Sequence, residues 1–291
     1  SSPVVYKGSV YIGVSSFGDC PSIQGQLVQV SAINGSIQNI FDIVPNGCIG
    51  GSVWGSPTID QRTGKLFIAT GNPDTCWTTE VYAVSVIELM ASDLSVVSSW
   101  EVPQSQWVDD SDFGSTPTLF TATIGGIQRS LVGVINKNGT FYALDRNIIS
   151  AGPVWSVQVA DDDGSIAPTA WDASKLYVAG GQTHIDGNIC QGSLRALDPA
   201  TGNIIWERCL TDSRELAPVT AVPGLVTDED GHSVDVRDTR TGNTLFHYKD
   251  SNRGSIFYGA VTIAHGVLYV GNMDGNLYAF GLYHPSTLKL T

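Results

Sequence analysis

Five side chains in the first half of this 291-residue chain could do chemistry together: Trp54, Asn72, Asp109, Asp112 and Lys137. Carboxylates such as those of Asp109 and Asp112 can accept a proton from a substrate or bind a hard cation, which also accepts amide oxygens. The ammonium group of Lys137 would stabilise negative charge that develops in a reaction. A solvated acidic loop is the alternative interpretation of the aspartate run, because the chain makes another such loop at Asp161–Asp163.

Other kinds of active site find little support in the sequence. The five histidines are scattered, with no pair at helical spacing and no serine or cysteine motif around them, which argues against a hydrolase triad or a histidine metal site. The five cysteines have no metal-ligand spacing and no haem-attachment motif, so neither zinc nor haem is predicted.

A repeated pattern indicates the elements that must position these residues. A small or proline-containing step leads into an apolar strand six times, at Ser2-Pro3, Ser56-Pro57, Thr116-Pro117, Ala167-Pro168, Ala217-Pro218 and Gly259-Ala260. Further strands follow, separated by glycine-containing turns and often closed by an aromatic residue, namely Trp100, Trp155, Trp206 or Phe246. A period of about 40 to 60 residues with four strands per unit is typical of a β-propeller. The fold class is therefore predicted to be all-β, a propeller with about six repeats.

We predict a single propeller domain over residues 1–291 that begins in mid-propeller, with residues 283–291 as a C-terminal tail. The end unit, Phe257–Leu282, lacks its closing strand. An unpaired strand edge invites pairing with another chain. Self-association through an open blade edge is therefore one expectation.

Composition narrows the range of partners. The net charge is −13 and only 15% of the residues are charged, so the clustered Lys and Arg of a nucleic-acid surface are absent. No apolar run approaches the roughly 18 residues of a membrane helix. We expect no nucleic-acid partner and no membrane insertion.

Cysteine usage favours disulfides in an oxidising compartment, and hence a secreted or periplasmic protein. Cys190 and Cys209 flank one blade and could pair. Cys20, Cys48 and Cys76 fall in or near loops of the first two blades, where the sequence does not choose among pairs, and the odd count leaves one cysteine unpaired.

Three blocks in order carry a more specific resemblance: Gly50–Pro73, Val108–Pro117 and Asn136–Arg146. They resemble the quinoprotein alcohol dehydrogenases, including the polyvinyl-alcohol-dehydrogenase-like branch, whose usually eight-bladed propellers bind pyrroloquinoline quinone (PQQ) and Ca²⁺. The resemblance spans nearly the whole chain and maps onto the later six of eight blades.

The resemblance implies roles for individual residues. Trp54 would form the floor on which the quinone stacks, Lys137 would contact its ortho-carbonyl oxygens, and Asn72 would be a Ca²⁺ ligand. Asp109 falls on the catalytic base, which in this family also lies at the metal, and Asp112 is the competing candidate for the base.

The chain departs from the family pattern in the first blade. The family places a Ca²⁺-binding Glu in the loop after the second strand, where only Asp19, one methylene shorter, offers a carboxylate. The adjacent cysteine pair that caps the quinone in the family is missing, because Cys20 stands alone.

The resemblance implies a PQQ- and Ca²⁺-dependent alcohol dehydrogenase that oxidises a small-molecule or polymeric alcohol and passes electrons to an external acceptor. The alternative is a non-enzymatic propeller that serves as an interaction or assembly scaffold and keeps relic quinoprotein motifs, since one fold hosts many functions. Binding of carbohydrate or polymer by aromatic loops around Trp77, Trp107 and Trp171 is a third interpretation. The acidic triplet Asp228–Asp230 is interpreted as a hairpin tip rather than a metal site.

Overall fold

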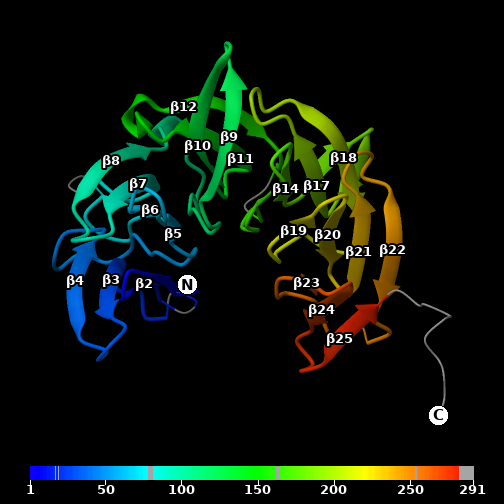
Figure 1. Ribbon diagram of the computed structural model, residues 1–291, viewed down its shortest axis with the longest axis horizontal. Coiled ribbons are helices and arrows are strands. Elements are labelled where there is room, and N and C mark those ends of the chain that lie inside the picture. Colours follow the sequence, from blue (N-terminus) through cyan, green and yellow to red (C-terminus); the bar gives the residue numbers. More distant parts are fainter. Residues whose placement is uncertain (17, 19, 78–80, 162–163, 253, 282–291) are drawn as a thin grey trace.

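The computed structural model describes residues 1–291 except 17, 19, 78–80, 162–163, 253 and 282–291. Five four-stranded sheets and one three-stranded sheet follow one another along the chain. They stand side by side as six blades of an open arc, with the first blade and the sixth at its two ends (Figure 1). The described residues contain strands and two short 3₁₀ helices, η1 (Gln104–Gln106) and η2 (Ile149–Ala151), and no α-helix. The predicted all-β propeller of about six repeats is confirmed.

The first three blades are antiparallel sheets in which neighbours in sequence are neighbours in space. Blade one contains β1 (Val4–Tyr6), β2 (Ser9–Val14), β3 (Gln26–Ser31) and β4 (Ile37–Asp42). Blade two contains β5 (Thr58–Asp60), β6 (Lys65–Ala69), β7 (Ser85–Met90) and β8 (Val96–Glu101). Blade three contains β9 (Thr118–Ile124), β10 (Ile127–Ile135), β11 (Thr140–Asp145) and β12 (Pro153–Gln158).

The fourth blade carries an additional hairpin, and the sixth has three strands within the described residues. Blade four contains β13 (Ala170–Trp171), β14 (Leu176–Gly180), β17 (Gly192–Leu197) and β18 (Ile204–Leu210), and the hairpin β15 (Thr183–Ile185) with β16 (Asn188–Cys190) is inserted after β14. Blade five contains β19 (Thr220–Val222), β20 (Leu225–Asp230), β21 (Ser233–Asp238) and β22 (Thr244–Lys249). Blade six contains β23 (Thr262–Ala264), β24 (Val267–Gly271) and β25 (Leu277–Gly281).

The recurring small or proline-containing steps lead into the first strand of a blade, and the first strands of blades one to five contact one another in succession along the arc. A threonine at the start of the strand donates to a backbone carbonyl of the next blade three times. Thr58 bonds to Pro117 at 2.7 Å, Thr118 to Thr169 at 2.9 Å and Thr220 to Val261 at 2.8 Å. At three blade junctions the repeat seen in the sequence is therefore accompanied by the same bond between blades.

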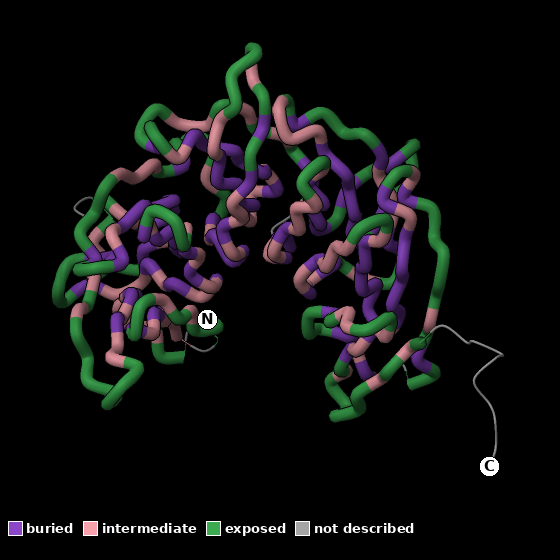
Figure 2. Tube along the Cα trace, in the orientation of Figure 1, coloured by how far each residue is buried: buried purple, intermediate pink, exposed green. Residues whose placement is uncertain are grey.

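The core lies mainly between blades rather than in one central mass, with buried residues inside the arc and exposed ones along its rim (Figure 2). Each apolar cluster joins residues of two adjacent sheets; one joins Phe67, Val84 and Val86 of blade two to Val132 and Tyr142 of blade three. Inner strands such as β7, β11 and β14 are buried almost along their whole length, because both of their faces are covered by neighbouring blades.

The aromatic residues that close the blades act at the same junctions. Trp155 on β12 donates from its indole N–H to the carbonyl of Pro199 at 3.0 Å, and Trp206 on β18 donates to that of Thr239 at 3.0 Å. The Trp155 ring covers Gly202 of the next blade, at a φ of 75°, and a Cβ there would lie 2.5 Å from the ring. The turn glycine is thus needed for its backbone angle and for the lack of a side chain.

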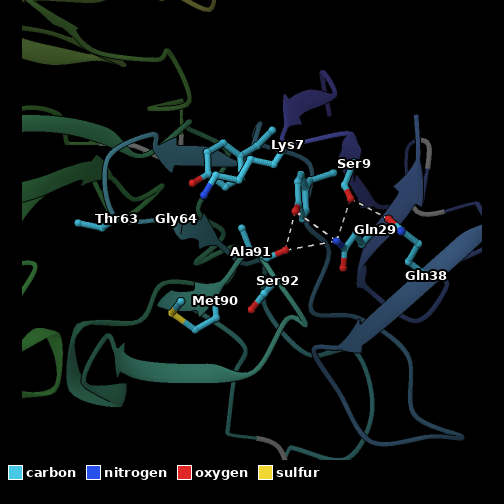
Figure 3. A pocket seen from close by; sticks show the side chains of 11 residues that line it. Lys7, Ser9, Gln29, Gln38, Thr63, Gly64, Met90, Ala91 and Ser92 are labelled. Carbon is cyan, nitrogen blue, oxygen red and sulfur yellow. Dashed lines mark hydrogen bonds between the residues drawn. The ribbon is translucent and has the colours of Figure 1, made fainter. Parts of the chain in front are cut away.

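A network of polar side chains links blades one and two beside the turn that connects β1 to β2 (Figure 3). Gln29 donates to Ser9 at 3.0 Å and to Tyr11 at 3.2 Å, and Tyr11 donates to the carbonyl of Ala91 at 2.5 Å. These groups line a recess of about 380 Å³. The polar groups of Ser9, Tyr11 and Gln29 are satisfied by these bonds within the protein. We therefore interpret the recess as part of the packing between the two blades.

The disulfides confirm the expected pair in blade four and show which two of the three cysteines in the first two blades are joined. Cys190 and Cys209 pair, and Cys48 pairs with Cys76. Cys20 is free and exposed. No helix in the described part of the chain is long and apolar enough to span a membrane.

Asp228–Asp230 does not form a hairpin tip, so that interpretation is wrong. The three residues are the last of β20 and are buried, because they pair with Ser233–Asp235 of β21 and the turn lies beyond them. The Asp228 carboxylate forms an ion pair with Arg237, with 2.6 Å between the Arg237 Nε and the Asp228 Oδ1.

Candidate functional site

Loops of blades two and three bring four of the sequence-predicted residues to one end of their strands. Trp54 precedes β5, Asn72 follows β6, Asp112 precedes β9 and Lys137 follows β10. Because strands in a blade alternate in direction, the start of a first strand and the end of a second strand lie at the same end of the sheet. Residues more than 80 positions apart in sequence thereby share one face of the arc.

Asp112 is the residue to which the other groups connect. Its carboxylate accepts a 2.7 Å hydrogen bond from the backbone N–H of Asn72, and the ammonium group of Lys137 lies 3.2 Å from it. The backbone N–H of Lys137 also donates to the carbonyl of Asp112 at 2.9 Å. Asp112 therefore joins blade two to blade three at this face.

Lys137 lies between an aromatic ring and two carboxylates. Its ammonium nitrogen is 5.1 Å from the centroid of the Trp54 ring, within the range of a cation–π interaction, and 2.6 Å from Asp110. Burial alone would lower the pKa of Lys137, but the hydrogen bond to Asp110 and the attraction of Asp112 outweigh it and raise the pKa. Lys137 is a fixed positive charge beside the ring.

Burial raises the pKa of Asp112 above its ordinary value, and repulsion from Asp110 adds to the effect. The attraction of Lys137 and the N–H of Asn72 oppose the shift without cancelling it. A carboxylate whose pKa is raised toward neutrality is a stronger proton acceptor than an ordinary aspartate.

Two glycines allow these close approaches. A Cβ on Gly71 would lie 2.5 Å from the Asp112 Oδ1, and a Cβ on Gly114 would overlap the six-membered ring of Trp54. The backbone of Gly71 can therefore approach the carboxylate of Asp112, and the backbone of Gly114 can approach the indole of Trp54.

A cavity of about 180 Å³ opens beside Asp112, and its lining is rich in oxygen atoms. The lining includes Ser16, Ser52, Asn72, Asp74, Asp110 and Asp112. Within the described part of the chain, the side-chain amide of Asn72 has one weak contact, 3.5 Å from its Nδ2 to the carbonyl of Pro73. Its amide oxygen is thus available as a ligand atom in the cavity wall.

The oxygen types fit a hard cation such as Ca²⁺, which prefers carboxylate, amide and hydroxyl oxygens. The described residues hold no group of three His, Cys, Asp or Glu side chains placed to bind one metal ion. Lys137 also occupies one oxygen each of Asp110 and Asp112. A cation here would take only part of its ligands from the described side chains.

The other two predicted residues stand apart from this cluster. Asp109 is exposed, does not line the cavity, and makes no ion pair or hydrogen bond with the described part of the chain. Asp19 lies outside the described residues.

Asp110 is the site residue that sequence reasoning passed over. Asp110 and Asp112 both contact Lys137 and line the cavity, while Asp109 does neither. Asp109 and Asp110 form a turn, in which the Ser111 hydroxyl bonds to the N–H and the carbonyl of Val108. The alternation of an extended strand does not hold there, so the spacing of the acidic run gave no signal that separates Asp109 from the other two aspartates.

The Cys48–Cys76 disulfide joins two of the loops that line the cavity, and the sequence had not linked it to the site. Backbone bonds reinforce it: the N–H of Gly51 donates to the carbonyl of Asn72 at 2.8 Å, and that of Asp74 to the carbonyl of Ile49 at 3.1 Å. The segment from Asn72 to Cys76 is therefore tied to the segment from Cys48 to Gly51.

Comparison with solved structures decides the type of propeller. The quinohemoprotein alcohol dehydrogenase of Comamonas testosteroni superposes with a TM-score of 0.75 at 16% identity, over 97% of this chain and 60% of that one. The enzyme ADHIIG of Pseudomonas putida HK5 gives 0.73 at 16% identity, over 92% of this chain and 54% of that one. This chain has the propeller fold of the quinoprotein alcohol dehydrogenases. The sequence resemblance to that fold is thereby confirmed.

At the level of sequence, the chain is similar to a polyvinylalcohol dehydrogenase of a Pseudomonas species, with 24% identity over 96% of this chain. The match covers 44% of that protein, so this chain spans less than half the length of its curated relative. No family model matches the chain.

Proposed function

We propose that this propeller is the cofactor-binding part of a PQQ- and Ca²⁺-dependent alcohol dehydrogenase that passes electrons to an external acceptor. The observation that carries the proposal is the cluster of Trp54, Lys137 and Asp112 beside an oxygen-lined cavity. An aromatic face, a fixed cation and a proton acceptor are the groups that a flat anionic quinone and an alcohol substrate require.

When bound, the quinone would supply the electron-accepting carbonyl and the cation would polarise it. Trp54 would cover one face of the ring and exclude water from it. Lys137 would stabilise the negative charge gained on reduction. The amide oxygen of Asn72 would serve as a metal ligand, with Asp19 and Asp109 as the further candidates.

Asp112 is our first choice for the base that takes the hydroxyl proton of the alcohol. It lines the cavity and its pKa is raised, whereas Asp109 is exposed and does not line it. Asp109 remains the residue that the family resemblance favours, and a pair of variants can separate the two.

The two disulfides favour a secreted or periplasmic protein. The substrate class, a small-molecule or polymeric alcohol, follows from the similarity to the dehydrogenases. Pairing through the edge of β25, the last strand of blade six, is the self-association that we would look for.

Isothermal titration of PQQ into the chain, with Ca²⁺ and again with a chelator, tests the proposal. We expect Ca²⁺-dependent binding that Trp54→Ala and Asn72→Ala abolish and that Trp54→Phe keeps in part, because a ring remains. Asn203→Ala, an exposed turn residue of blade four, is the matched control for Asn72→Ala. Absence of binding at high micromolar PQQ would overturn the proposal and leave the scaffold interpretation.

A further inference from the structure

The turn between β3 and β4 of blade one carries an acceptor sequence for an N-linked glycan. Asn34-Gly35-Ser36 supplies an asparagine followed, two residues later, by a hydroxyl residue, which is the pattern of such a site. The turn between β10 and β11 of blade three carries a second one, Asn138-Gly139-Thr140. Both sequences fit the pattern, so the surroundings of the two asparagines in the fold must distinguish them.

The side-chain amide of Asn34 lies at the surface. Its Oδ1 accepts the backbone N–H of Ser36 at 3.1 Å and the Ser36 hydroxyl at 2.9 Å. Only the oxygen of an amide accepts such bonds, so these contacts define which end of the side chain is the nitrogen. Within the described residues, the Nδ2 of Asn34 has no hydrogen-bond partner.

The turn that carries Asn34 leaves room for a bulky group. Residues 32–38 are all exposed. Gly35 has a φ of 73°, and no atom lies within 4 Å of the position that its Cβ would take. An oligosaccharide on Asn34 can therefore extend into solvent without displacing a neighbouring segment of the described chain.

Asn138 lies in the opposite kind of environment. It is partly buried, and its Nδ2 donates to the carbonyl of Gln106 at 3.1 Å and to the hydroxyl of Tyr142 at 2.9 Å. A glycan replaces one of the two N–H groups of the amide, so at least one of these bonds would be lost. Asn138 also follows Lys137 directly, so a glycan there would stand beside the candidate site.

The two turns lie at opposite ends of their blades. Because strands alternate in direction, the turn after the third strand of a blade is at the other end from the turn after the second strand. The Asn138 turn follows β10, the second strand of blade three, and shares the end of Lys137. The Asn34 turn follows β3, a third strand, and the N–H of Ala32 donates at 2.9 Å to the carbonyl of Gly8 in the β1–β2 turn. A glycan on Asn34 would therefore leave the candidate site open.

Exposed apolar side chains surround the Asn34 turn. Ile33 is 91% exposed, and Ile37 and Ile40 on β4 are 62% and 50% exposed. β4 is the outermost strand of blade one, on the outside of the arc (Figure 1), and pairs only with β3 in the described part of the chain. An unpaired strand edge with apolar side chains invites association unless something covers it. A bulky, polar group on Asn34 would cover Ile33 and the start of β4.

We propose that Asn34 is the acceptor of an N-linked glycan and that this glycan covers the exposed edge of β4. In the transfer, Nδ2 of Asn34 forms a bond to C1 of an oligosaccharide that is carried on a lipid diphosphate. The bond between C1 and the diphosphate oxygen breaks, Nδ2 releases a proton, and the lipid diphosphate leaves. The inference depends on passage through an oxidising secretory compartment, for which the two disulfides argue, and not on the quinone site.

Expression of the chain behind a secretion signal in cultured insect cells tests the acceptor. Protein from the medium and from the cell lysate is analysed alike, because glycans are attached before export. Its disulfides are mapped, and release of the glycan by peptide-N-glycosidase in isotope-labelled water marks each modified asparagine as a labelled aspartate for mass spectrometry. We expect the label at Asn34 in most disulfide-bonded molecules and no label at Asn138.

Variants show whether the acceptor sequence is responsible. Asn34→Gln and Ser36→Ala should abolish the modification, while Ser36→Thr, which keeps a hydroxyl, should retain it. Asn138→Gln and Asn203→Gln, the latter at an exposed turn outside any acceptor sequence, should leave the glycan on Asn34 unchanged. Disulfide-bonded chain without a glycan at Asn34, or with a glycan at Asn138 instead, would overturn the proposal.

Removal of the glycan tests its role at the edge of blade one. Sedimentation velocity should show a shift toward dimer after glycosidase treatment or in Asn34→Gln, relative to the glycosylated chain. Adding Ile37→Lys to Asn34→Gln should reverse that shift, because a charged side chain on an edge strand opposes pairing. Pairing through β25 would not respond to Ile37→Lys. Equal self-association with and without the glycan would reject the covering role.

Calorimetric titration of PQQ distinguishes this proposal from the dehydrogenase function. The glycosylated chain and Asn34→Gln should bind PQQ equally, because the β3–β4 turn lies at the end of its blade away from the candidate site. Failure of both to bind PQQ, with Asn34 modified in the unmutated chain, would reject the dehydrogenase function and leave the glycan site in place.

Discussion

The backbone N–H of Asn72 donates a 2.7 Å hydrogen bond to the carboxylate of Asp112. Because the donor is the backbone, the orientation of Asp112 does not depend on the side chain of residue 72. The bond therefore separates two roles: the amide of Asn72 is free to bind a ligand, while its backbone positions a carboxylate of the neighbouring blade.

A substitution of Asp112 can test whether this residue is the base that takes the proton of the alcohol. Asp112→Asn keeps the shape of the side chain and removes its ability to take a proton, so alcohol oxidation should fall by about 10²- to 10⁴-fold. PQQ affinity should change far less, since Trp54 and Lys137 remain. Steady-state dye reduction with PQQ and Ca²⁺ measures the first and titration the second. If Asp109→Asn abolishes turnover and Asp112→Asn does not, the assignment by geometry is wrong.

Removal of each disulfide in turn can separate an effect on cofactor binding from an effect on the stability of the fold. Replacing Cys48 and Cys76 together by Ser should cost about 3 kcal/mol of stability, as expected for a loop of this length, and should also weaken PQQ binding, because the two loops of the cavity wall are released. Replacing Cys190 and Cys209 should cost a similar amount of stability and leave PQQ binding unchanged. Denaturant unfolding and calorimetric titration give both quantities. Equal effects of the two double variants on PQQ binding would contradict this prediction.

A buried pair of carboxyl groups should make the stability depend on pH. Both carboxylate oxygens of Glu229 are buried, and the carboxyl group of Glu215 is their hydrogen-bonding neighbour. Burial, with repulsion from Asp228, raises the pKa of Glu229 to about 8. Burial and repulsion from Glu229 also raise the pKa of Glu215, whose carboxylate accepts the backbone N–H of Glu229.

A carboxyl group whose pKa is higher in the folded state stabilises the fold fully below its unfolded value, about 4.3, and loses that contribution as the pH rises through the folded value near 8. Glu229→Gln should therefore flatten the decline in unfolding free energy between pH 5 and 8 and raise stability above it. Asp186→Asn, at an exposed turn, is the control. Parallel pH profiles for Glu229→Gln and the unmodified chain would contradict this mechanism.

Substitution of two turn glycines can distinguish the cost of backbone strain from the cost of a steric overlap at a blade junction. Gly187 has a φ of 77° and open space within 4 Å of where a Cβ would stand, and Gly202 has a φ of 75° beneath the Trp155 ring. Gly187→Ala should cost about 1–2 kcal/mol for the left-handed backbone alone. Gly202→Ala should cost about 1–3 kcal/mol more, because the added carbon overlaps the indole. Thermal unfolding of both variants measures the difference, and equal losses would show that the ring moves aside without cost.

The sequence by itself determined the class of fold. Small or proline-containing steps, apolar strands with glycine turns and closing aromatic residues recur because every blade solves the same packing problem, and the bonds of Thr58, Thr118 and Thr220 to the next blade repeat for the same reason. The Cys190–Cys209 pair and the short sheet of the end unit, which has three strands in the described residues, could also be predicted, because both depend on residues close together along the chain.

Only the tertiary structure decided which polar groups meet. Asp109 and Asp112 are equivalent as residue types, and the direction of the segment before β9 brings Asp112 with Asp110 to Lys137 while leaving Asp109 exposed. The burial of Glu229, the clamp of the cavity wall by Cys48–Cys76 and the meeting of Trp77 with Trp107 likewise depend on contacts between loops distant in sequence. Strand periodicity fixes which face a side chain takes within its own blade, but the distance between two loops depends on how neighbouring blades pack.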